Sequence, residues 1–331
     1  MSARPWSQNR TKRPSARPRK SIRWMQLEQL EARRVLAAWN WTGGAGAGDT
    51  NWGTAANWAD TITALPGVPA ANDDLNFPAG PTQLISNNNL AANTAFNSIN
   101  ITGNGYVIQG AAIVLNTSLS ASYVAGAAGT SSTLSLNIAS DGDGIAVTKG
   151  DTGVLTIGGN NTYLGVTTIN RGTVVVTSGN AFGASGPGNQ TVVVGADAGT
   201  GTSINLSPTV AGITVPESFS WAANAGGRVT IRNTAQNNTL SGPIDVTSTG
   251  TFPQVFSDGT GALTFTGDIT GSNPGADTFV IRGVSTNALN AIRGSVNLTG
   301  GALTKTDSGV WGIGAANPTG CLAPDRAIPG P

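Results

Sequence analysis

The chain has no histidine among its 331 residues, so its possible chemistry depends on carboxylates and arginines. Without histidine it cannot form a Ser-His-Asp or Cys-His nucleophilic arrangement, or the zinc motif H-E-x-x-H. Two kinds of polysaccharide chemistry remain. One is glycoside cleavage by paired acids, and the other is a lyase reaction with Asp-bound Ca²⁺ and an arginine base. The candidate acids are Asp73 with Asp74, and Asp141 with Asp143.

Neither acidic pair has the spacing of a working site. The neighbours Asp73 and Asp74 point to opposite faces of an extended strand. Asp141-Gly-Asp143-Gly resembles half of a calcium loop, but Ile145 stands where a third oxygen ligand belongs, which favours a polar turn. The arginines of the body are scattered singly, without two acids at a recurring spacing: Arg171, Arg228, Arg232, Arg282 and Arg293. We expect no catalytic residue, no cofactor and no metal.

The composition favours β-structure over helix. Charged residues make up 11% of the chain, about half the usual share, and the 46 glycines are about twice the usual number. Many Val, Ile and Thr residues suit strands, and glycine suits turns that need a positive φ. The single cysteine, Cys321, allows no intramolecular disulfide, so packing and backbone hydrogen bonds must stabilise the fold.

The formal charge of +1 is unevenly distributed. Ten of the 18 Lys and Arg residues precede residue 37, beside only Glu28 and Glu31, so this head carries +8. The other eight basic and 15 acidic residues give the body a net charge of −7. We therefore expect no nucleic acid on the body. The head is either part of an export signal or a segment that binds nucleic acid or anionic lipid by charge.

An internal repeat is the strongest structural signal. Thr148–Gly158 (TKGDTGVLTIG) and Thr304–Gly314 (TKTDSGVWGIG) are identical at seven of eleven positions, and Thr260–Gly267 is a looser copy. From about Leu84, short apolar-polar alternations follow one another, broken by Gly, Asn and Asp. Such self-similar short strands are typical of a solenoid in which each rung covers its neighbour's apolar face. The sequence therefore predicts an all-β solenoid of stacked parallel strands.

The solenoid predicts where each residue type lies. Val, Ile, Leu and Ala should fill the interior, while Asn and Gly suit the corners because they tolerate left-handed backbone. Charge should be sparse, because like charges one rung apart would repel at about 5 Å. Thr173–Val176 and Thr191–Val194 are 18 residues apart, and we interpret this interval as about one rung.

The N-terminal part reads as three segments. Residues 1–20 are basic and nearly devoid of apolar residues, so we expect them to be disordered. Residues 21–38 contain good helix formers with Ser21 as a possible N-cap, and they form the one predicted helix. Residues 39–83 are a Trp-rich lead-in. No stretch of the chain approaches the ~18 consecutive apolar residues of a membrane helix.

The lead-in holds four of the eight tryptophans: Trp39, Trp41, Trp52 and Trp58. An exposed indole face suits the C–H groups of sugars, so these rings could form a stacking platform for a ligand. Alternatively they cap the first rung, whose apolar end must be covered for the protein to stay soluble. We favour the cap, because few charged groups that would orient a sugar follow these rings.

The segment Lys149–Val176 resembles an autotransporter-associated β-strand repeat, with Asp151 in place of one glycine. The positions that match are Gly153, Leu155, Ile157, Asn161, Thr162, Tyr163, Gly165, Thr167, Ile169 and Gly172. The resemblance implies a right-handed parallel β-helix in an exported or surface-displayed bacterial protein, often the passenger of an outer-membrane barrel. We expect this solenoid over residues 84–314, with repeats near 148–183 and from 303. Residues 315–331 read as an irregular tail, which we interpret as a truncated end.

A second resemblance concerns export. Leu30, Glu31, Arg33 and Leu36 match the LEPR-XLL motif found near the N-terminus of large exported bacterial proteins, with Ala32 in place of its Pro and Val35 in place of a Leu. The alternative is a short surface helix with a charged face. The longest apolar run of the head is too short for a standard signal peptide.

Together these features predict a non-enzymatic, exported protein with a structural or adhesive role at the cell surface or in the extracellular matrix. Its partners would be surface or matrix polysaccharides, or other surface proteins. The alternative is a polysaccharide-active enzyme, a lyase or glycoside hydrolase, that works in a groove of the solenoid with Asp, Arg and Ca²⁺.

Overall fold

The structure is a computed structural model that describes residues 36–123, 131–195, 201–222, 228–247, 253–271, 278–299, 301–314 and 327–329. Several predictions fall outside these ranges: the disordered head, the helix up to residue 35, the export-motif residues Leu30, Glu31 and Arg33, and Cys321. Leu36 is described and exposed, and a strand begins at Ala38.

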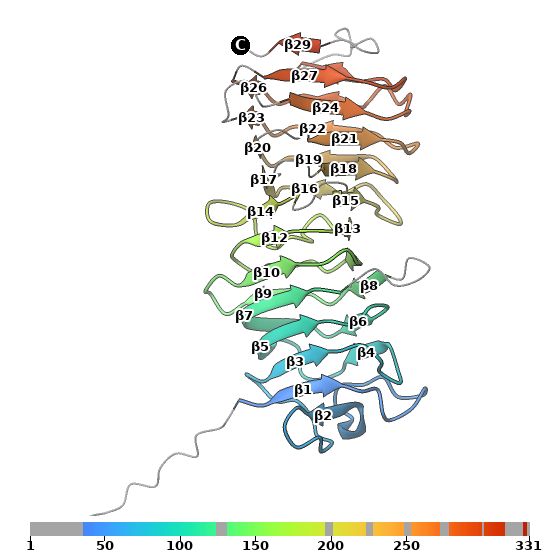
Figure 1. Ribbon diagram of the computed structural model, residues 1–331, viewed down its shortest axis with the longest axis vertical. Coiled ribbons are helices and arrows are strands. Elements are labelled where there is room, and N and C mark those ends of the chain that lie inside the picture. Colours follow the sequence, from blue (N-terminus) through green and yellow to red (C-terminus); the bar gives the residue numbers. More distant parts are fainter. Residues whose placement is uncertain are drawn as a thin grey trace, which may run out of the picture. The chain divides into compact units, whose positions relative to one another are not determined.

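The described chain is all-β, apart from one 3-10 turn at Ala55–Asn57, and it is the predicted parallel β-solenoid (Figure 1). Strands from successive rungs stack in chain order and form three sheets, here called A, B and C. Parallel ladders of this kind need crossover connections, which the other sides of each rung supply. The arrangement is consistent with the right-handed winding that such crossovers favour.

Sheet A contains, in spatial order, β2 (Trp58–Asp60), β1 (Ala38–Trp41), β3 (Asp74–Phe77), β5 (Thr94–Ile101), β7 (Ile113–Ala121), β10 (Ala146–Lys149), β12 (Thr167–Ile169), β14 (Gln190–Val193), β17 (Ser218–Trp221), β20 (Ile244–Val246), β23 (Ile269–Gly271) and β26 (Val296–Leu298). A further strand, β9 (Ile138–Ser140), pairs with β7. The ladder of sheet A thus includes β3, which lies within the Trp-rich lead-in.

Sheet B contains β4 (Ile85–Asn88), β6 (Val107–Gly110), β8 (Ser131–Leu134), β11 (Val154–Ile157), β13 (Thr173–Val176), β15 (Thr202–Leu206), β18 (Val229–Asn233), β21 (Gln254–Ser257), β24 (Thr278–Arg282), β27 (Ala302–Lys305) and β29 (Ala327–Pro329). Sheet C contains β16 (Thr214–Val215), β19 (Asn238–Leu240), β22 (Leu263–Phe265), β25 (Ala291–Ile292) and β28 (Gly312–Ile313).

Antiparallel pairs occur at two edges of the described sheets. At one edge of sheet A, β2 pairs antiparallel with β1. At one edge of sheet B, β29 pairs antiparallel with β27. Unpaired backbone groups of an edge strand would otherwise remain free to pair with another chain. Both pairs therefore cover an edge that a continuing rung would otherwise occupy.

The solenoid gains a side partway along the chain. Up to β15 every strand belongs to sheet A or sheet B, in alternation except at β1–β3 and at β9–β10, whereas from β16 onward the strands run through C, A and B in turn. In the two-sided part, Val147 pairs with Thr167 after 20 residues. In the three-sided part, Phe219 pairs with Ile244 after 25 residues. Rung length varies in the earlier part, where Thr173 pairs with Ser203 after 30 residues, so the extra side does not by itself set the length.

The interpretation of an 18-residue rung is wrong. Thr173–Val176 is β13 in sheet B, and residues 191–193 belong to β14 in sheet A. The two similar segments therefore lie on different sides of the solenoid and do not stack on each other. The stacked partner of Thr173 is Ser203 in β15. The two segments have similar sequences because in both of them outward-facing residues alternate with buried ones.

The internal repeat encodes a corner rather than a complete rung. Its first copy places Lys149 at the end of β10 in sheet A, and its second places Lys305 at the end of β27 in sheet B. In both copies the buried Lys Nζ donates to a backbone carbonyl two residues later, that of Asp151 or of Asp307. The shared sequence therefore folds the chain around a lysine that points inward.

Stacked columns of apolar side chains form the core. One column in sheet A runs through Phe219, Ile244 and Ile269, all at most 2% exposed. Beside it, the ring of Trp221 stacks on that of Phe279 at 5.4 Å between centroids, from sheets A and B. Full burial of one such side chain stabilises a protein by about 1.5–3 kcal/mol, so the columns provide most of the cohesion.

Glycines permit close contact between rungs at the corner that leads from sheet C to sheet A. A Cβ on Gly242, Gly267 or Gly294 would lie 1.9, 2.0 or 2.1 Å from a backbone oxygen of the preceding rung. The oxygen that Gly267 faces belongs to Gly242, and the one that Gly294 faces belongs to Gly267. No side chain fits there, because real Cβ contacts are longer than 3.0 Å.

We predict that Gly267→Ala lowers the free energy of unfolding by about 1–3 kcal/mol, because the added methyl group forces neighbouring rungs apart. Chemical denaturation followed by circular dichroism measures the change. Gly48→Ala is the control, because nothing lies within 4 Å of its Cβ position. Equal stabilities of the two variants would contradict this account of the corner.

Candidate functional site

The first predicted acidic pair holds the solenoid together at its N-terminal end. Asp73 is 2% exposed, and its carboxylate accepts hydrogen bonds from Trp39 Nε1 at 2.9 Å and from the backbone N–H of Ala70 at 2.8 Å. The Asp74 carboxylate instead accepts from Asn97 Nδ2 at 2.7 Å and from the Ser98 hydroxyl. The two carboxylates therefore serve different neighbours and do not converge.

The second predicted acidic pair lies in a turn. Asp141 Oδ1 accepts a hydrogen bond from the backbone N–H of Asp143 at 3.3 Å, and both residues lie in the turn between β9 and β10. Among the described residues, no group of three or more His, Cys, Asp or Glu side chains is placed to hold a metal ion.

The residues that carry the family resemblance serve the architecture. Leu155, Ile157, Tyr163 and Ile169 lie in the core, and Thr162 is exposed. Buried Asn161 accepts from the Ile138 N–H at 2.9 Å and donates to the Ala181 carbonyl at 2.8 Å, which joins three rungs. The glycines meet close neighbours or have a positive φ: Gly153, Gly165 and Gly172.

Three of the four lead-in tryptophans are buried. Trp41, Trp52 and Trp58 are at most 1% exposed, and the rings of Trp52 and Trp58 meet edge to face at 5.6 Å. Trp52 Nε1 donates to Ser86 Oγ at 2.6 Å. Buried rings cannot offer a face to a ligand, so this arrangement supports the cap. Trp39 is half-buried, with Gly67 directly against its ring.

A buried polar cluster interrupts the apolar interior where the third sheet begins. Glu217, immediately before β17, is 3% exposed and accepts a hydrogen bond from the Thr191 hydroxyl at 2.9 Å. On the rung below, the Tyr163 hydroxyl lies 2.9 Å from Thr167 Oγ1. Glu217 Oε2 has no hydrogen-bond partner among the described residues. Burial raises the pKa of Glu217 to about 8, so its carboxyl is largely protonated at neutral pH.

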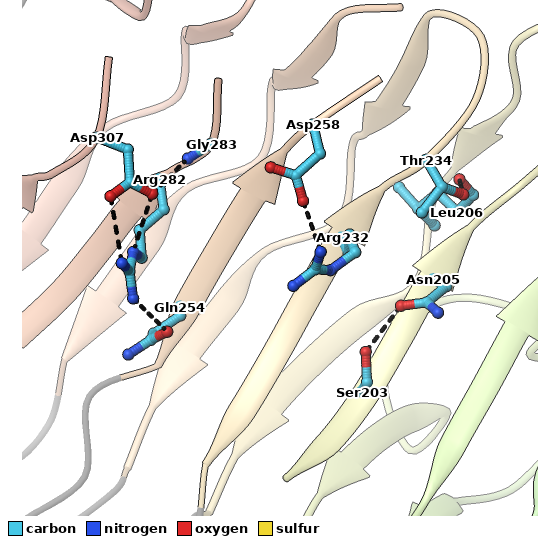
Figure 2. Close-up of polar contacts among 10 residues, drawn as sticks. All are labelled: Ser203, Asn205, Leu206, Arg232, Thr234, Gln254, Asp258, Arg282, Gly283 and Asp307. Carbon is cyan, nitrogen blue, oxygen red and sulfur yellow. Dashed lines mark hydrogen bonds and ion pairs between the residues drawn. The ribbon is translucent and has the colours of Figure 1, made fainter. Parts of the chain in front are cut away.

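Charged, amide and hydroxyl side chains gather on the outer face of sheet B, over β15, β18, β21 and β24 (Figure 2). The in-register ladder places Asn205, Arg232, Phe256 and Arg282 in one outward column. We use the name sheet B strip for this column with its neighbours, which comprises Ser203, Asn205, Arg232, Gln254, Phe256, Asp258, Arg282 and Asp307.

Each arginine of the strip pairs with an aspartate of the following rung. Arg232 Nη1 lies 2.7 Å from Asp258 Oδ2. Arg282 binds Asp307 with two nitrogens, Nε to Oδ2 and Nη2 to Oδ1, both at 3.2 Å. The hydrogen bonds from Arg282 hold the pKa of Asp307 below its ordinary value.

Phe256 lies between the two guanidinium groups. Its ring centroid is 4.5 Å from Arg232 Cζ and 5.1 Å from Arg282 Cζ, within the range of a cation–π contact. Gln254, on the same strand as Phe256, accepts from Arg282 Nη1 at 3.4 Å. The ring therefore packs against both arginines and the amide holds Arg282, while the side chains of Arg232 and Arg282 stay 41% and 32% exposed.

Further hydrogen-bonding groups lie within the strip and beside it. At the β15 end, Ser203 Oγ donates to Asn205 Oδ1 at 2.8 Å. At the corner after β21, Asp258 also lines an open surface pocket of about 360 Å³, with Ser285 and Asn287 on the next rung. Hydroxyl, amide, carboxylate and guanidinium groups thus follow one another across several rungs.

The sequence by itself did not predict this site. Arg232 and Asp258 are 26 residues apart, and Arg282 and Asp307 are 25 apart, which matches the 25-residue rung of the three-sided part. These intervals are present in the sequence, but a rung of 18 residues would not bring these arginines and aspartates together. The other arginines lie elsewhere: Arg171 lines a corner pocket with Asp151, and Arg228 and Arg293 are exposed outside the strip.

Comparisons with protein-family models, with curated proteins and with solved structures gave no match. The family resemblance therefore rests on the residues of the chain themselves. In the described ranges, no helix is long and apolar enough to span a bilayer.

For the cap, we predict that Trp52→Ala lowers the free energy of unfolding by about 3–5 kcal/mol, because it leaves a cavity beneath three aromatic rings. Trp39→Ala, at the half-buried ring, should cost less. Denaturation midpoints of both variants measure the difference. Equal losses, or none at Trp52, would contradict the cap.

For the buried acid, we predict that wild-type stability falls as pH rises from about 5 to 7.5, by about 1.4 kcal/mol per unit. The folded state retains the Glu217 proton up to a pKa of about 8, whereas the unfolded chain releases it near 4.5. The contribution of Glu217 to stability is therefore complete below the lower value and is lost as the pH rises through the higher one. With no histidine in the chain, few other groups titrate in this window.

Glu217→Gln keeps the shape of the side chain and cannot ionise, so its stability should be nearly constant over the same pH window. Urea denaturation at several pH values gives both slopes. Parallel slopes for wild type and variant would mean that the Glu217 carboxyl ionises normally inside the folded protein.

Proposed function

We propose that this protein is an exported, non-enzymatic β-solenoid that acts as a structural or adhesive element at the cell surface or in the extracellular matrix. The observation that carries the proposal is the sheet B strip: ordered, exposed hydrogen-bonding groups on the flat outer face of a rigid scaffold. The resemblance of residues 149–176 to autotransporter-associated repeats supports the location, as does the LEPR-XLL-like sequence around Leu30.

The carboxylates of the strip support a binding role over glycoside hydrolysis. A general acid needs a raised pKa, and its partner carboxylate must be free to act as a base or nucleophile. Asp307 has a lowered pKa and is held by Arg282, and Asp258 is held by Arg232. Glu217, whose pKa is raised, lies inside the solenoid, where no polymer can reach it.

The lyase alternative receives no support from the described residues. A lyase of this type needs several acids around Ca²⁺ and an arginine free to act as base. The described part of the chain has no cluster of three acids, and the two strip arginines are engaged with aspartates. A structural or adhesive role requires neither feature.

The location is tested by protease shaving of intact cells, with antibodies raised against the solenoid. We expect the protein to be cleaved from the surface or recovered from the medium, while a cytosolic marker stays intact. A variant without residues 1–36 should remain inside the cell. Full protection of the wild-type protein, with recovery only from the cytosol, would contradict the proposal.

A further inference from the structure

We propose that the sheet B strip binds a linear, uncharged polysaccharide that lies along the stacking direction of the rungs. This inference rests on the proposed function, because it names the partner that such a surface element would hold. The ladder places Arg232, Phe256 and Arg282 in one column, so the binding groups form a line across the strands.

The spacing of the strip suits a polymer. Neighbouring rungs are about 4.8 Å apart, so the two arginines, two rungs apart, recur at roughly 10 Å along the column. That interval is comparable to two sugar units of an extended chain. Asn205 lies one rung before Arg232 in the same column, which extends the contact line beyond the charged pairs.

The charges of the strip favour an uncharged ligand. Each guanidinium is neutralised by its own carboxylate, Arg232 by Asp258 and Arg282 by Asp307. The body as a whole carries −7, which would repel an acidic polymer. Each pair also presents donors and acceptors side by side, and sugar hydroxyls both donate and accept hydrogen bonds. The strip is therefore complementary to the hydroxyl groups of a sugar rather than to an anion.

The strip is ordered before any ligand arrives. Arg282 is held through Nε and Nη2 by Asp307 and through Nη1 by Gln254, and Phe256 packs between it and Arg232. The ring faces are covered by guanidinium groups, so Phe256 positions the arginines rather than stacking on sugar. Arg232 engages Asp258 through Nη1, which leaves donors for a ligand. Binding would thus require little further ordering of side chains.

The open pocket at the corner after β21 provides a second feature beside the strip. Asp258 belongs to both, and Ser285 and Asn287 add a hydroxyl and an amide on the next rung. Val284, 60% exposed, also lines this pocket and offers an apolar contact for sugar C–H groups. A polymer on the strip would therefore meet polar and apolar groups at this corner as well.

Affinity electrophoresis of the purified full chain tests the proposal. The gels contain mixed-linkage β-glucan, linear xylan or mannan as uncharged probes, and polygalacturonate as the acidic probe. We expect at least one uncharged polymer to retard the wild-type protein, with little change as salt rises. Arg232→Gln and Arg282→Gln should each weaken the binding about tenfold, because each removes charge-assisted hydrogen bonds.

Two further variants separate a binding role from a structural one. Arg293→Gln removes an exposed arginine outside the strip and should bind like the wild type. Asn205→Ala removes a strip amide without breaking an ion pair, and it should weaken binding at unchanged melting temperature. Full binding by Arg232→Gln and Asn205→Ala would overturn the inference.

The other possible results of the electrophoresis and of the protease shaving test the ligand and the location separately. Retardation by polygalacturonate alone, weakening as salt rises, would make the strip an anion site and overturn the inference. So would a failure of every uncharged polymer to retard the wild type. If the protein is nevertheless cleaved from intact cells, only the ligand is wrong. If it is protected in the cytosol, the proposed function fails independently of these gels.

Discussion

The whole structure depends on one constraint: each rung must lie in register on the rung before it. Because neighbouring strands are about 4.8 Å apart, a side chain in a stacked strand lies against its equivalents in the rungs on either side. The interior columns of apolar residues, such as Phe219, Ile244 and Ile269, follow from this repetition. So do the corner glycines, where the backbone of one rung contacts that of the next.

The same constraint limits where charge can be placed. Two guanidinium groups on adjacent rungs would repel, and in the strip Phe256 separates Arg232 from Arg282 while each pairs with an aspartate on the following rung. Inside the solenoid, burial lowers the pKa of Lys149 to about 8, and its Nζ donates to the carbonyl of Arg171. Charge is therefore sparse overall, and the strip arginines and Lys149 each have a partner.

The titratable groups of the interior and the charged groups of the surface differ in what they can do. Glu217 and Lys149, two groups with strongly shifted pKa values, are at most 3% exposed and lie within the scaffold. The exposed groups of the strip are held in ion pairs, which suits recognition of a partner more than proton transfer. A stiff surface that presents the same kinds of groups at regular intervals is well matched to a repeating partner.

The sequence alone determined the fold class, because short alternating strands, abundant glycine and an internal repeat are local features that each rung must satisfy. It also located most core positions, such as Leu155 and Ile157, through their alternation. Only the tertiary structure decided which strands stack, since β13 and β14 look alike in sequence but form different sides. The strip depended on that decision: Arg232 and Asp258 meet because a full three-sided rung separates them, and rung length is set by how corners and sides pack rather than by any short motif.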